Sequence, residues 1–180
     1  MAISKKVLLV GEPAVGKTSL VRRFVEQQFS DDYQSSIGVN VKQKNVAYHH
    51  NFPETPVELK LMIYDLQGQH GKKEPPYDSY MKGANGVMAV FDLARPETVD
   101  AIADFWVPRA RKVAGHVPIY LVGNKHDLKP DVKMLGTAIA PILSKLKGER
   151  LDGLLTSAKT DENVEKAFYD LGKMILQGAK

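Results

Sequence analysis

The chain has 180 residues, of which 43% are hydrophobic and 26% charged, which is enough to bury one sizeable core in a single domain over residues 1–180. Because the chain contains no cysteine, disulfides, thiolate metal sites and a thiol nucleophile are excluded. The net charge of +4 is mild and the lysines are scattered among acids, which argues against a nucleic-acid partner.

The first predicted element is a buried strand over residues 5–10, and an amphipathic helix follows from residue 17 to residue 27 or 28. Between them, residues 11–18 read Gly-Glu-Pro-Ala-Val-Gly-Lys-Thr. In this context the backbone N–H groups of the loop and the helix N-terminus can bind a phosphate chain, Lys17 can reach the outer phosphates, and the Thr18 hydroxyl can ligate Mg²⁺. A plain glycine turn has no need of Lys-Thr at its end, so we predict a phosphate-binding loop.

The next segment is predicted to contain an exposed loop and a strand pair. Residues 29–36 are polar and rich in turn formers. Alternating valines indicate a half-buried strand over residues 39–46, and a cleaner alternation indicates another over residues 57–63, with residues 49–56 as the hairpin connection. The polar residues 70–78 should form a mobile loop that leads into a short helical turn at residues 80–81.

The second half alternates between strands and helices. Residues 86–93 are apolar almost throughout, which predicts a central strand buried on both faces. A helix should run from residue 96 toward residue 113, with Pro108 kinking it or shifting its boundary, and with an inner side made of Val99, Ile102, Ala103 and Trp106. Further strands are predicted over residues 117–123 and 153–156, and further helices over residues 134–147 and 161–176.

This order of elements predicts the fold class. Parallel strands need helical crossovers, whereas the early hairpin supplies one antiparallel strand. We therefore expect a three-layer α/β protein, in which a six-stranded, mostly parallel sheet with one antiparallel edge strand carries helices on both faces.

A second loop follows the strand at residues 57–63 and suits phosphate chemistry. Asp65 lies at the carboxyl end of this strand, the edge where parallel sheets bind ligands, and it can hold Mg²⁺ through water. The Gly68 N–H can bind a terminal phosphate, and Gln69 can orient an attacking water. The glycine loop alone is compatible with kinases, ATPases and GTPases, and the spacing of the other loops decides among them.

The sequence Asn-Lys-His-Asp at residues 124–127 carries a base preference. The Asp127 carboxylate can accept two hydrogen bonds from N1–H and the amino group of guanine, a pair of donors that adenine lacks on that edge. Lys125 can cover one face of the purine, and Asn124 can tie this loop to the glycine loop. In Ser-Ala-Lys at residues 157–159, the Ala158 N–H can donate to guanine O6.

Together these motifs resemble those of the Ras-like small GTPases, and most closely the Rab branch, over nearly the full length of the chain. The matching segments are Gly-x4-Gly-Lys-Thr, Tyr-Gln-Ser-Ser-Ile-Gly-Val at residues 33–39, Asp-x-x-Gly-Gln at 65–69, Lys-Gly-Ala at 82–84, Asn-Lys-x-Asp at 124–127 and Ser-Ala-Lys at 157–159. The resemblance implies the P-loop NTPase fold and a molecular switch that binds GTP or GDP with Mg²⁺ and hydrolyses GTP slowly. Its two nucleotide-sensitive loops would be switch I, at about residues 31–39, and switch II, at about residues 65–80.

The resemblance also implies roles for individual residues. Phe29 would pack against the guanine and Tyr33 would lie over the phosphates. Ser36 would ligate the metal together with Thr18 and with Asp65, the last through water. The catalytic residues would be Gln69 and Lys17. The further nucleotide-binding positions would be Pro13, Ala14, Val15, Gly16, Thr18, Ser19, Ser36, Gly68, Asn124, Lys125, Asp127, Leu128, Ser157, Ala158 and Lys159.

Several residues depart from the family pattern. Pro13 stands where the family has Gly or Ser facing the γ-phosphate, and it removes a backbone donor while stiffening the loop. Ser36 stands in place of a metal-binding Thr. Val41 and Tyr64 replace the Phe and Trp of the Rab effector-binding surface, which puts recognition of ordinary Rab effectors in doubt.

Two hypotheses about function therefore stay open. The first is a slow GTPase switch, and the second is a scaffold module that binds GTP or GDP with negligible hydrolysis because of Pro13. A kinase that phosphorylates a small molecule is disfavoured, because its chemistry gives no purpose to the guanine-reading loop or to Asp-x-x-Gly-Gln.

The resemblance further implies partners at the switch loops, namely a GTPase-activating protein, an exchange factor and effectors in trafficking or signalling, and a monomeric state. No apolar run approaches the roughly 20 residues of a membrane-spanning helix, and Ala2 stands where a myristoylation signal needs glycine. We expect a cytoplasmic protein that reaches a membrane surface only through a partner or through a lipidated C-terminus absent from this sequence.

Overall fold

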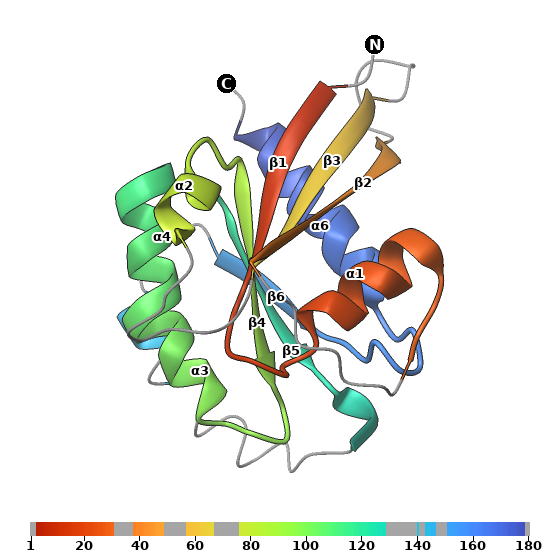
Figure 1. Cartoon of the computed structure of the whole chain (residues 1–180), viewed down its shortest axis with the longest axis vertical. Coiled ribbons are helices and arrows are strands. Elements are labelled where there is room, and N and C mark those ends of the chain that lie inside the picture. Colours follow the sequence, from red (N-terminus) through yellow and green to blue (C-terminus); the bar gives the residue numbers. More distant parts are fainter. Residues whose placement is uncertain are drawn as a thin grey trace.

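The structure is a computed structural model that describes residues 3–30, 38–48, 57–66, 76–128, 140, 143–146 and 151–178. Six strands form one sheet in the order β2-β3-β1-β4-β5-β6 (Figure 1). Their bounds are β1 Ile3–Val10, β2 Val39–Tyr48, β3 Val57–Leu66, β4 Gly86–Asp92, β5 Ile119–Asn124 and β6 Leu151–Leu155. β2 is antiparallel to β3 and every other neighbouring pair is parallel, so the predicted sheet is confirmed.

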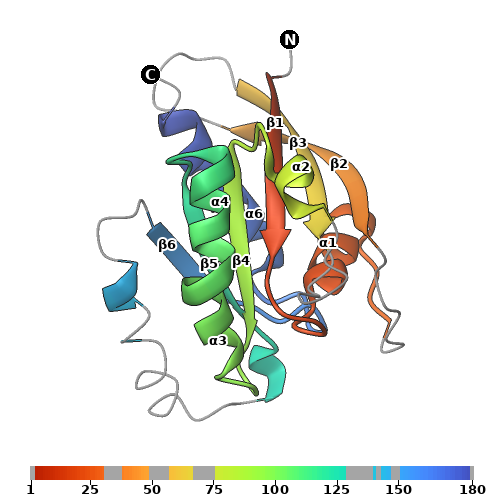
Figure 2. The same ribbon diagram turned by 60° about the vertical axis from the view of Figure 1, so that its left-hand side comes forward.

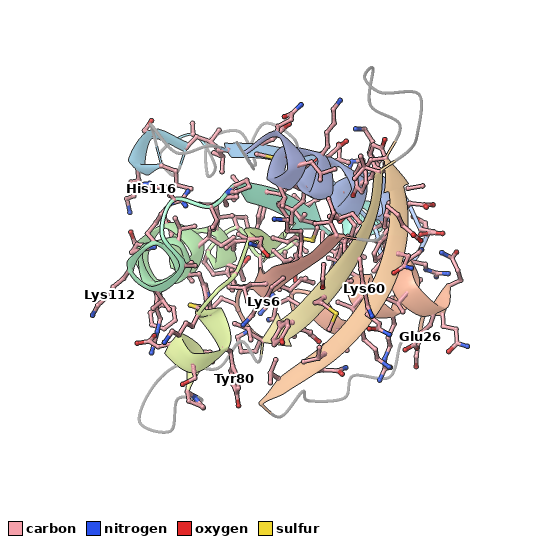
Figure 3. All side chains as sticks on the ribbon, turned by 90° about the horizontal axis from the view of Figure 1, so that it is seen from above. Lys6, Glu26, Lys60, Tyr80, Lys112 and His116 are labelled. Carbon is pink, nitrogen blue, oxygen red and sulfur yellow. The ribbon has the colours of Figure 1, made fainter. Side chains whose placement is uncertain are left out.

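Helices cover both faces of this sheet. On one face lie α1 (Lys17–Glu26) and α6 (Val164–Gln177), and on the other lie α2 (Tyr77–Met81) and a continuous helical stretch made of α3 (Thr98–Ala101), η1 (Ile102–Trp106) and α4 (Val107–Ala114) (Figures 1 and 2). A view from above separates the same three layers (Figure 3). The short 3₁₀ helix η2 (His126–Leu128) follows β5. Among the helices that the structure describes, none is long and apolar enough to cross a membrane.

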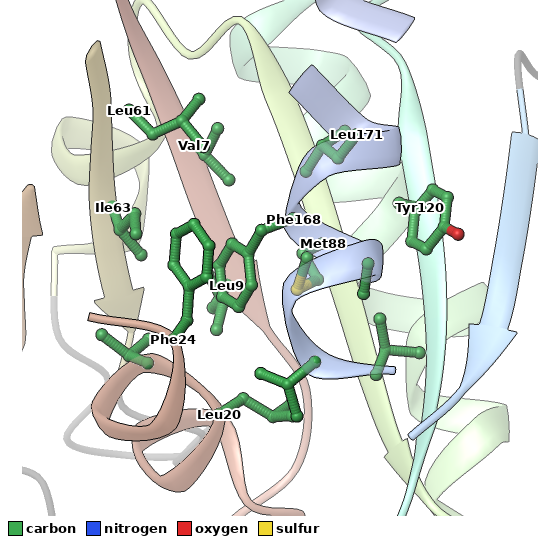
Figure 4. Packing of buried hydrophobic residues seen from close by; sticks show 14 of the residues in the cluster. Val7, Leu9, Leu20, Phe24, Leu61, Ile63, Met88, Tyr120, Phe168 and Leu171 are labelled. Atoms are coloured by element: carbon green, nitrogen blue, oxygen red, sulfur yellow. The ribbon is translucent and has the colours of Figure 1, made fainter. Parts of the chain in front are cut away.

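The alternation of side chains along β1 explains why the sheet needs both helical layers. Val7 and Leu9 pack into the cluster beneath α1 and α6, while Leu8 and Val10 pack into the cluster beneath α2 and α4. In the first of these clusters the rings of Phe24 on α1 and Phe168 on α6 stack with centroids 4.1 Å apart (Figure 4). This contact fixes α1, and with it the end of the glycine loop, against the sheet.

The helix predicted over residues 96–113 differs in detail from the prediction. It begins at Thr98, and its middle part, η1, is a π-helix in which the Val107 N–H bonds to the carbonyl of Ile102. Pro108 accounts for this widening, because it has no N–H to bond to Asp104 and its ring crowds that carbonyl. The four residues predicted for the inner side are buried.

The prediction for the closing helix was wrong at its start, since α6 begins at Val164 rather than at residue 161. Asp161 and Asn163 have φ values of 66° and 58°, which no right-handed helix accommodates. The turn that they form lets the Ser157 N–H donate to the carbonyl of Glu162 at 3.1 Å, so the chain at residues 157–162 closes on itself before the helix begins.

Other boundaries move by a few residues. β1 begins at Ile3, β2 continues without a break to Tyr48, β5 and β6 are shifted by two residues at their starts, and α2 begins at Tyr77, inside the predicted loop. Of the helix predicted over residues 134–147, residues 140 and 143–145 are described and helical. The predicted hairpin connection at 49–56 and most of the predicted loops at 29–36 and 70–78 lie outside the described residues.

Candidate nucleotide-binding site

The loop between β1 and α1 has a backbone that demands glycine at two positions. Gly11 and Gly16 have φ values of 142° and 99°. A Cβ on Gly11 would lie 2.1 Å from the carbonyl oxygen of Val90, and one on Gly16 would lie 2.2 Å from Nδ2 of Asn124. Both glycines therefore allow the loop to approach β4 and β5 closely. Ala14 also has a positive φ, of 60°, although it is not a glycine.

Lys17 lies at the start of α1 and turns back into this loop. Its Nζ donates to the carbonyl oxygens of Gly11 and Glu12, each at 2.8 Å, and the residue is only 6% exposed. Burial lowers the pKa of Lys17 to about 8, against the opposing effect of the Asp65 and Glu12 carboxylates. The loop thus surrounds an ammonium group that can bind a phosphate oxygen.

Thr18 and Asp65 bring two oxygen donors together from distant parts of the chain. The Thr18 hydroxyl donates to Oδ2 of Asp65 at 2.5 Å. The other carboxylate oxygen, Oδ1, is buried and has no hydrogen-bond partner among the residues that the structure describes. Burial raises the pKa of Asp65, while the hydrogen bond from Thr18 and the charges of Lys17 and Arg22 oppose this shift. Hard oxygen donors of this kind fit Mg²⁺.

Asn124, at the end of β5, joins its own loop to two others. Its bond to the glycine loop was predicted from the sequence. Its Nδ2 donates to the carbonyl of Val15 at 2.9 Å, and its Oδ1 accepts from the Thr156 hydroxyl and from the Ala158 N–H, both at 3.2 Å. Asn124 is 2% exposed and Thr156 is fully buried, so these bonds are shielded from water. The predicted bond from Ala158 to guanine O6 would have to share the N–H that here donates to Asn124.

The remaining residues of the predicted base-reading loop, which follows β5, are held in place by their neighbours. Oδ1 of Asp127 accepts a hydrogen bond of 2.6 Å from the Ser157 hydroxyl, which orients the carboxylate. Nζ of Lys125 forms an ion pair of 2.8 Å with Oδ2 of Asp92 at the end of β4. Lys125 itself has a φ of 69°, and the following Leu128 is exposed.

Arg23 on α1 contacts the other side of the predicted base pocket. Its Nε donates to the carbonyl of Ala158 and its Nη2 to the carbonyl of Lys159, each at 3.0 Å. Its guanidinium also lies 5.7 Å from the ring centroid of Phe29, a half-buried residue packed against the core cluster under α1 and α6. This role of Arg23 could not be predicted from the sequence, because two arginines on the polar side of a helix are typical of a solvated surface.

The structure gathers most of the predicted site at one edge of the sheet, where β1, β4 and β5 end (Figure 2). This edge holds the glycine loop with Pro13 and Val15, Ser19 in the first turn of α1, Asp65 near the end of β3, and the two loops at residues 124–128 and 157–159. Tyr33, Ser36, Gly68 and Gln69 lie outside the described residues. Val41 and Tyr64, which depart from the Rab pattern, are direct partners across β2 and β3.

Sequence reasoning also missed Asp92 and Arg95. Asp92 is 1% exposed and binds both Lys125 and Arg95 through Oδ2. Burial alone would raise its pKa, but hydrogen bonds from Lys125, Arg95 and the Ala94 N–H hold the pKa below the usual value. A signal was available, since Asp92 is the only acid in an otherwise apolar strand and stands at its carboxyl end.

Comparisons with known proteins agree with this geometry. The sequence model of the Ras family matches residues 6–177. The chain is similar to Ras-related protein Rab-1 of Theileria annulata, with 32% identity over 171 residues that cover 94% of this chain and 73% of the relative. It is also similar to Ras-related protein Rab-4A of Danio rerio, with 34% identity over 172 residues that cover 95% and 76% of the two chains. With Ras-related protein Rab-13 of Mesocricetus auratus it shares 32% identity over 171 residues, 95% of this chain and 79% of that one.

The structure thus combines three features. The glycine loop surrounds a buried lysine, a threonine pairs with an aspartate near a strand end, and Asn124 joins the glycine loop to the loop at residues 157–159. The sequence of this chain matches one family model almost from end to end. The sheet order and its single antiparallel strand agree with the fold that the sequence motifs implied. The chain belongs to the Ras family and is a small GTPase close to the Rab branch.

Proposed function

We propose that residues 1–180 act as a single G domain that binds GTP or GDP with Mg²⁺, hydrolyses GTP slowly and reports the bound nucleotide through switch I (31–39) and switch II (65–80) to partners in trafficking or signalling. The observation that carries this proposal is the buried Asn124 side chain, which bonds to the glycine loop and to the loop at residues 157–159 at once. A site built in this way couples phosphate binding to recognition of the base.

In the proposed site the guanine lies between Lys125 and Phe29, with its N1–H and amino group on the Asp127 carboxylate. The Ser157 hydroxyl occupies one lone pair of Oδ1 and holds the carboxylate in one orientation. A carboxylate that the bound base shields from water but leaves unpaired is costly, so a base without this pair of donors would be rejected.

The phosphates lie in the glycine loop, where Lys17 and the backbone N–H groups neutralise their charge. Thr18 and Ser36 would hold Mg²⁺ directly, and Asp65 would do so through water; the ion when bound would neutralise charge on the β- and γ-phosphates. Gln69 would position the attacking water. Support for the metal site comes from the buried Asp65 oxygen that lacks a partner in the described part of the chain.

The base-reading role is tested by Asp127→Asn. This variant should lose affinity for GTP and gain affinity for xanthosine triphosphate, because the amide can donate where the carboxylate only accepts. The matched control is Asp100→Asn on the exposed side of α3, which should bind both nucleotides like the parent chain. Unchanged GTP affinity in Asp127→Asn would refute the assignment.

The hydrolytic function is tested by single-turnover hydrolysis of preloaded GTP. We expect a slow rate above that of a protein-free control, and a further loss of rate without loss of affinity in Gln69→Leu. A parent rate equal to the protein-free control, with or without activating proteins, would instead favour the scaffold module that Pro13 suggests.

We further propose that a GTPase-activating protein, an exchange factor and effectors bind the monomeric chain at the switch loops. Tyr64 is half-buried and pairs across the strands with the exposed Val41. The ammonium of Lys6 lies 4.2 Å from the centroid of the Tyr64 ring. This surface is smaller and more cationic than a Phe–Trp pair, so the effectors should differ from those that require that pair. Binding assays of GTP-loaded and GDP-loaded protein with Val41→Phe/Tyr64→Trp, compared with the parent chain, test this preference.

A further inference from the structure

Arg95, in the turn after β4, contacts the glycine loop. Its Nη2 donates to the carbonyl oxygen of Pro13 at 2.9 Å, and its Nε pairs with Oδ2 of Asp92 at 2.9 Å. The backbone of Arg95 is itself fixed, because its N–H donates to the Asp92 carbonyl at 2.9 Å and its carbonyl accepts from the Thr98 hydroxyl at 2.7 Å. These four hydrogen bonds hold the guanidinium in one position, although Arg95 lies at the surface.

The bond to Pro13 controls the next N–H group of the loop. The Pro13 carbonyl and the Ala14 N–H belong to one planar, trans peptide unit, so they point in opposite directions. When Arg95 holds the carbonyl toward the β4 turn, the Ala14 N–H is held toward the other side of the loop. Ala14 has a φ of 60°, a conformation that costs a non-glycine residue roughly 1–2 kcal/mol and needs support from its surroundings.

Pro13 makes this support more important than it would be in a loop with glycine at the same place. Proline has no N–H, so the loop has one donor fewer for the phosphates, and its ring fixes only its own φ. The orientation of the peptide between Pro13 and Ala14 is left to other contacts, and among the described residues the Arg95 side chain supplies one.

The charge of Arg95 also reaches the phosphate site. Lys17 has its pKa lowered mainly by burial, and the positive charge of Arg95 adds to this lowering. The positive charge of Arg95 repels the charge on Lys17, and for the same reason it attracts a negative phosphate bound beside Lys17. The ion pair with Asp92, whose Oδ2 also binds Lys125, links this arginine to the base-reading loop.

We propose that Arg95 is a positioning residue for phosphate binding and GTP hydrolysis, which holds the Ala14 N–H toward the phosphate chain through the Pro13 carbonyl. This inference rests on the proposed function of the glycine loop. Because Pro13 has no N–H, the loop depends more on the Ala14 N–H, and Arg95 compensates by holding that group in place.

The test compares Arg95→Ala and Arg95→Lys with the parent chain. Loss of a charged hydrogen bond should reduce the single-turnover rate of GTP hydrolysis by about tenfold and weaken GTP and GDP binding by a similar factor. GMP binding should change less than GTP and GDP binding, because GMP lacks the outer phosphates that the glycine loop and Lys17 would bind. Arg95→Lys keeps the positive charge but replaces the two donor nitrogens Nε and Nη2 by one, so its losses should lie between those of the parent chain and those of Arg95→Ala.

A matched control is Lys166→Ala, which removes an exposed ion pair with Asp170 on α6, away from the site. It should leave binding and hydrolysis unchanged, and circular dichroism should show all three variants folded. In Pro13→Gly, which restores the donor, Arg95→Ala should reduce the rate by less than in the parent chain.

Unchanged GTP affinity and rate in Arg95→Ala would overturn the inference, and so would an equal loss of GMP, GDP and GTP affinity, which would indicate a general role in holding the base-reading loop. A parent chain that binds none of these nucleotides would overturn the proposed function itself, so the two failures are distinguishable.

Discussion

The amide of Asn124 donates to the carbonyl oxygen of Val15 at 2.9 Å, across 109 residues of sequence. This bond joins the loop after β5 to the glycine loop after β1, and it is buried. Neither loop can move far without breaking it. The proposed recognition of base and phosphates as one unit depends on this connection.

Asn124→Ala should destabilise the fold and accelerate nucleotide release together. The substitution leaves the Val15 carbonyl, the Thr156 hydroxyl and the Ala158 N–H without their partner, which should lower the free energy of unfolding by about 2–4 kcal/mol. Urea unfolding and the dissociation rate of a fluorescent GDP measure the two effects. The control Asn45→Ala removes an exposed bond to Glu58 and should change neither quantity measurably, so equal effects of the two variants would contradict the prediction.

Gly16→Ala should abolish tight nucleotide binding, because the new Cβ would lie 2.2 Å from Nδ2 of Asn124. The change should reduce GDP affinity by at least about tenfold, since the Asn124 side chain must move out of its bonds. Gly115→Ala is a suitable control, because Gly115 also has a positive φ, of 77°, but has nothing within 4 Å of an added Cβ. Both variants carry backbone strain, so only the difference in GDP affinity between them reports the clash.

Asp92→Asn should remove part of the pH dependence of stability. The folded pKa of Asp92 is lower than that of the unfolded chain, so this carboxylate stabilises the fold fully above the ordinary aspartate pKa of about 3.9, and this stabilisation is lost as the pH falls through the lower folded value. At pH 7 the variant should lose about 1–2 kcal/mol, because Lys125 and Arg95 are themselves partly exposed. Urea unfolding of both chains between pH 7 and pH 3 should show the two stabilities converging at low pH. Parallel curves would exclude this role of Asp92.

Arg23→Ala should speed up nucleotide release with little effect on stability. Two of its hydrogen bonds, to the carbonyls of Ala158 and Lys159, hold the loop at residues 157–159 against α1. Their loss should raise the GDP dissociation rate by about three- to tenfold, while the free energy of unfolding changes by less than about 1 kcal/mol. The control is Glu26→Ala on the same helix as Arg23, which breaks an ion pair with Lys42 of β2. Similar GDP dissociation rates in the two variants would show that Arg23 does not hold the base pocket.

Much of the site could be predicted because a phosphate-binding loop requires particular residue types at consecutive positions. The roles expected of Gly11, Gly16, Lys17 and Thr18 depend on local backbone conformation and on atoms close by, so the local sequence is enough to predict them. The strand before this loop and the helix after it also follow from local periodicity. The alternation of strands and helices, with one early hairpin, also made the fold class predictable, whereas the order of the strands in the sheet came from the structure.

The tertiary structure decided the contacts between loops that are far apart in sequence. Arg95 and Pro13 are 82 residues apart, and nothing in the pattern around either residue indicates the other. Asp92 and Lys125 likewise meet only because β4 and β5 are neighbours that end at the same level of the sheet. Local propensity acts over a few residues, whereas these hydrogen bonds form when the sheet brings its strand ends together. The sequence by itself therefore determined which chemistry this edge can perform, and the packing of the strands decided which side chains hold the chemical groups in place.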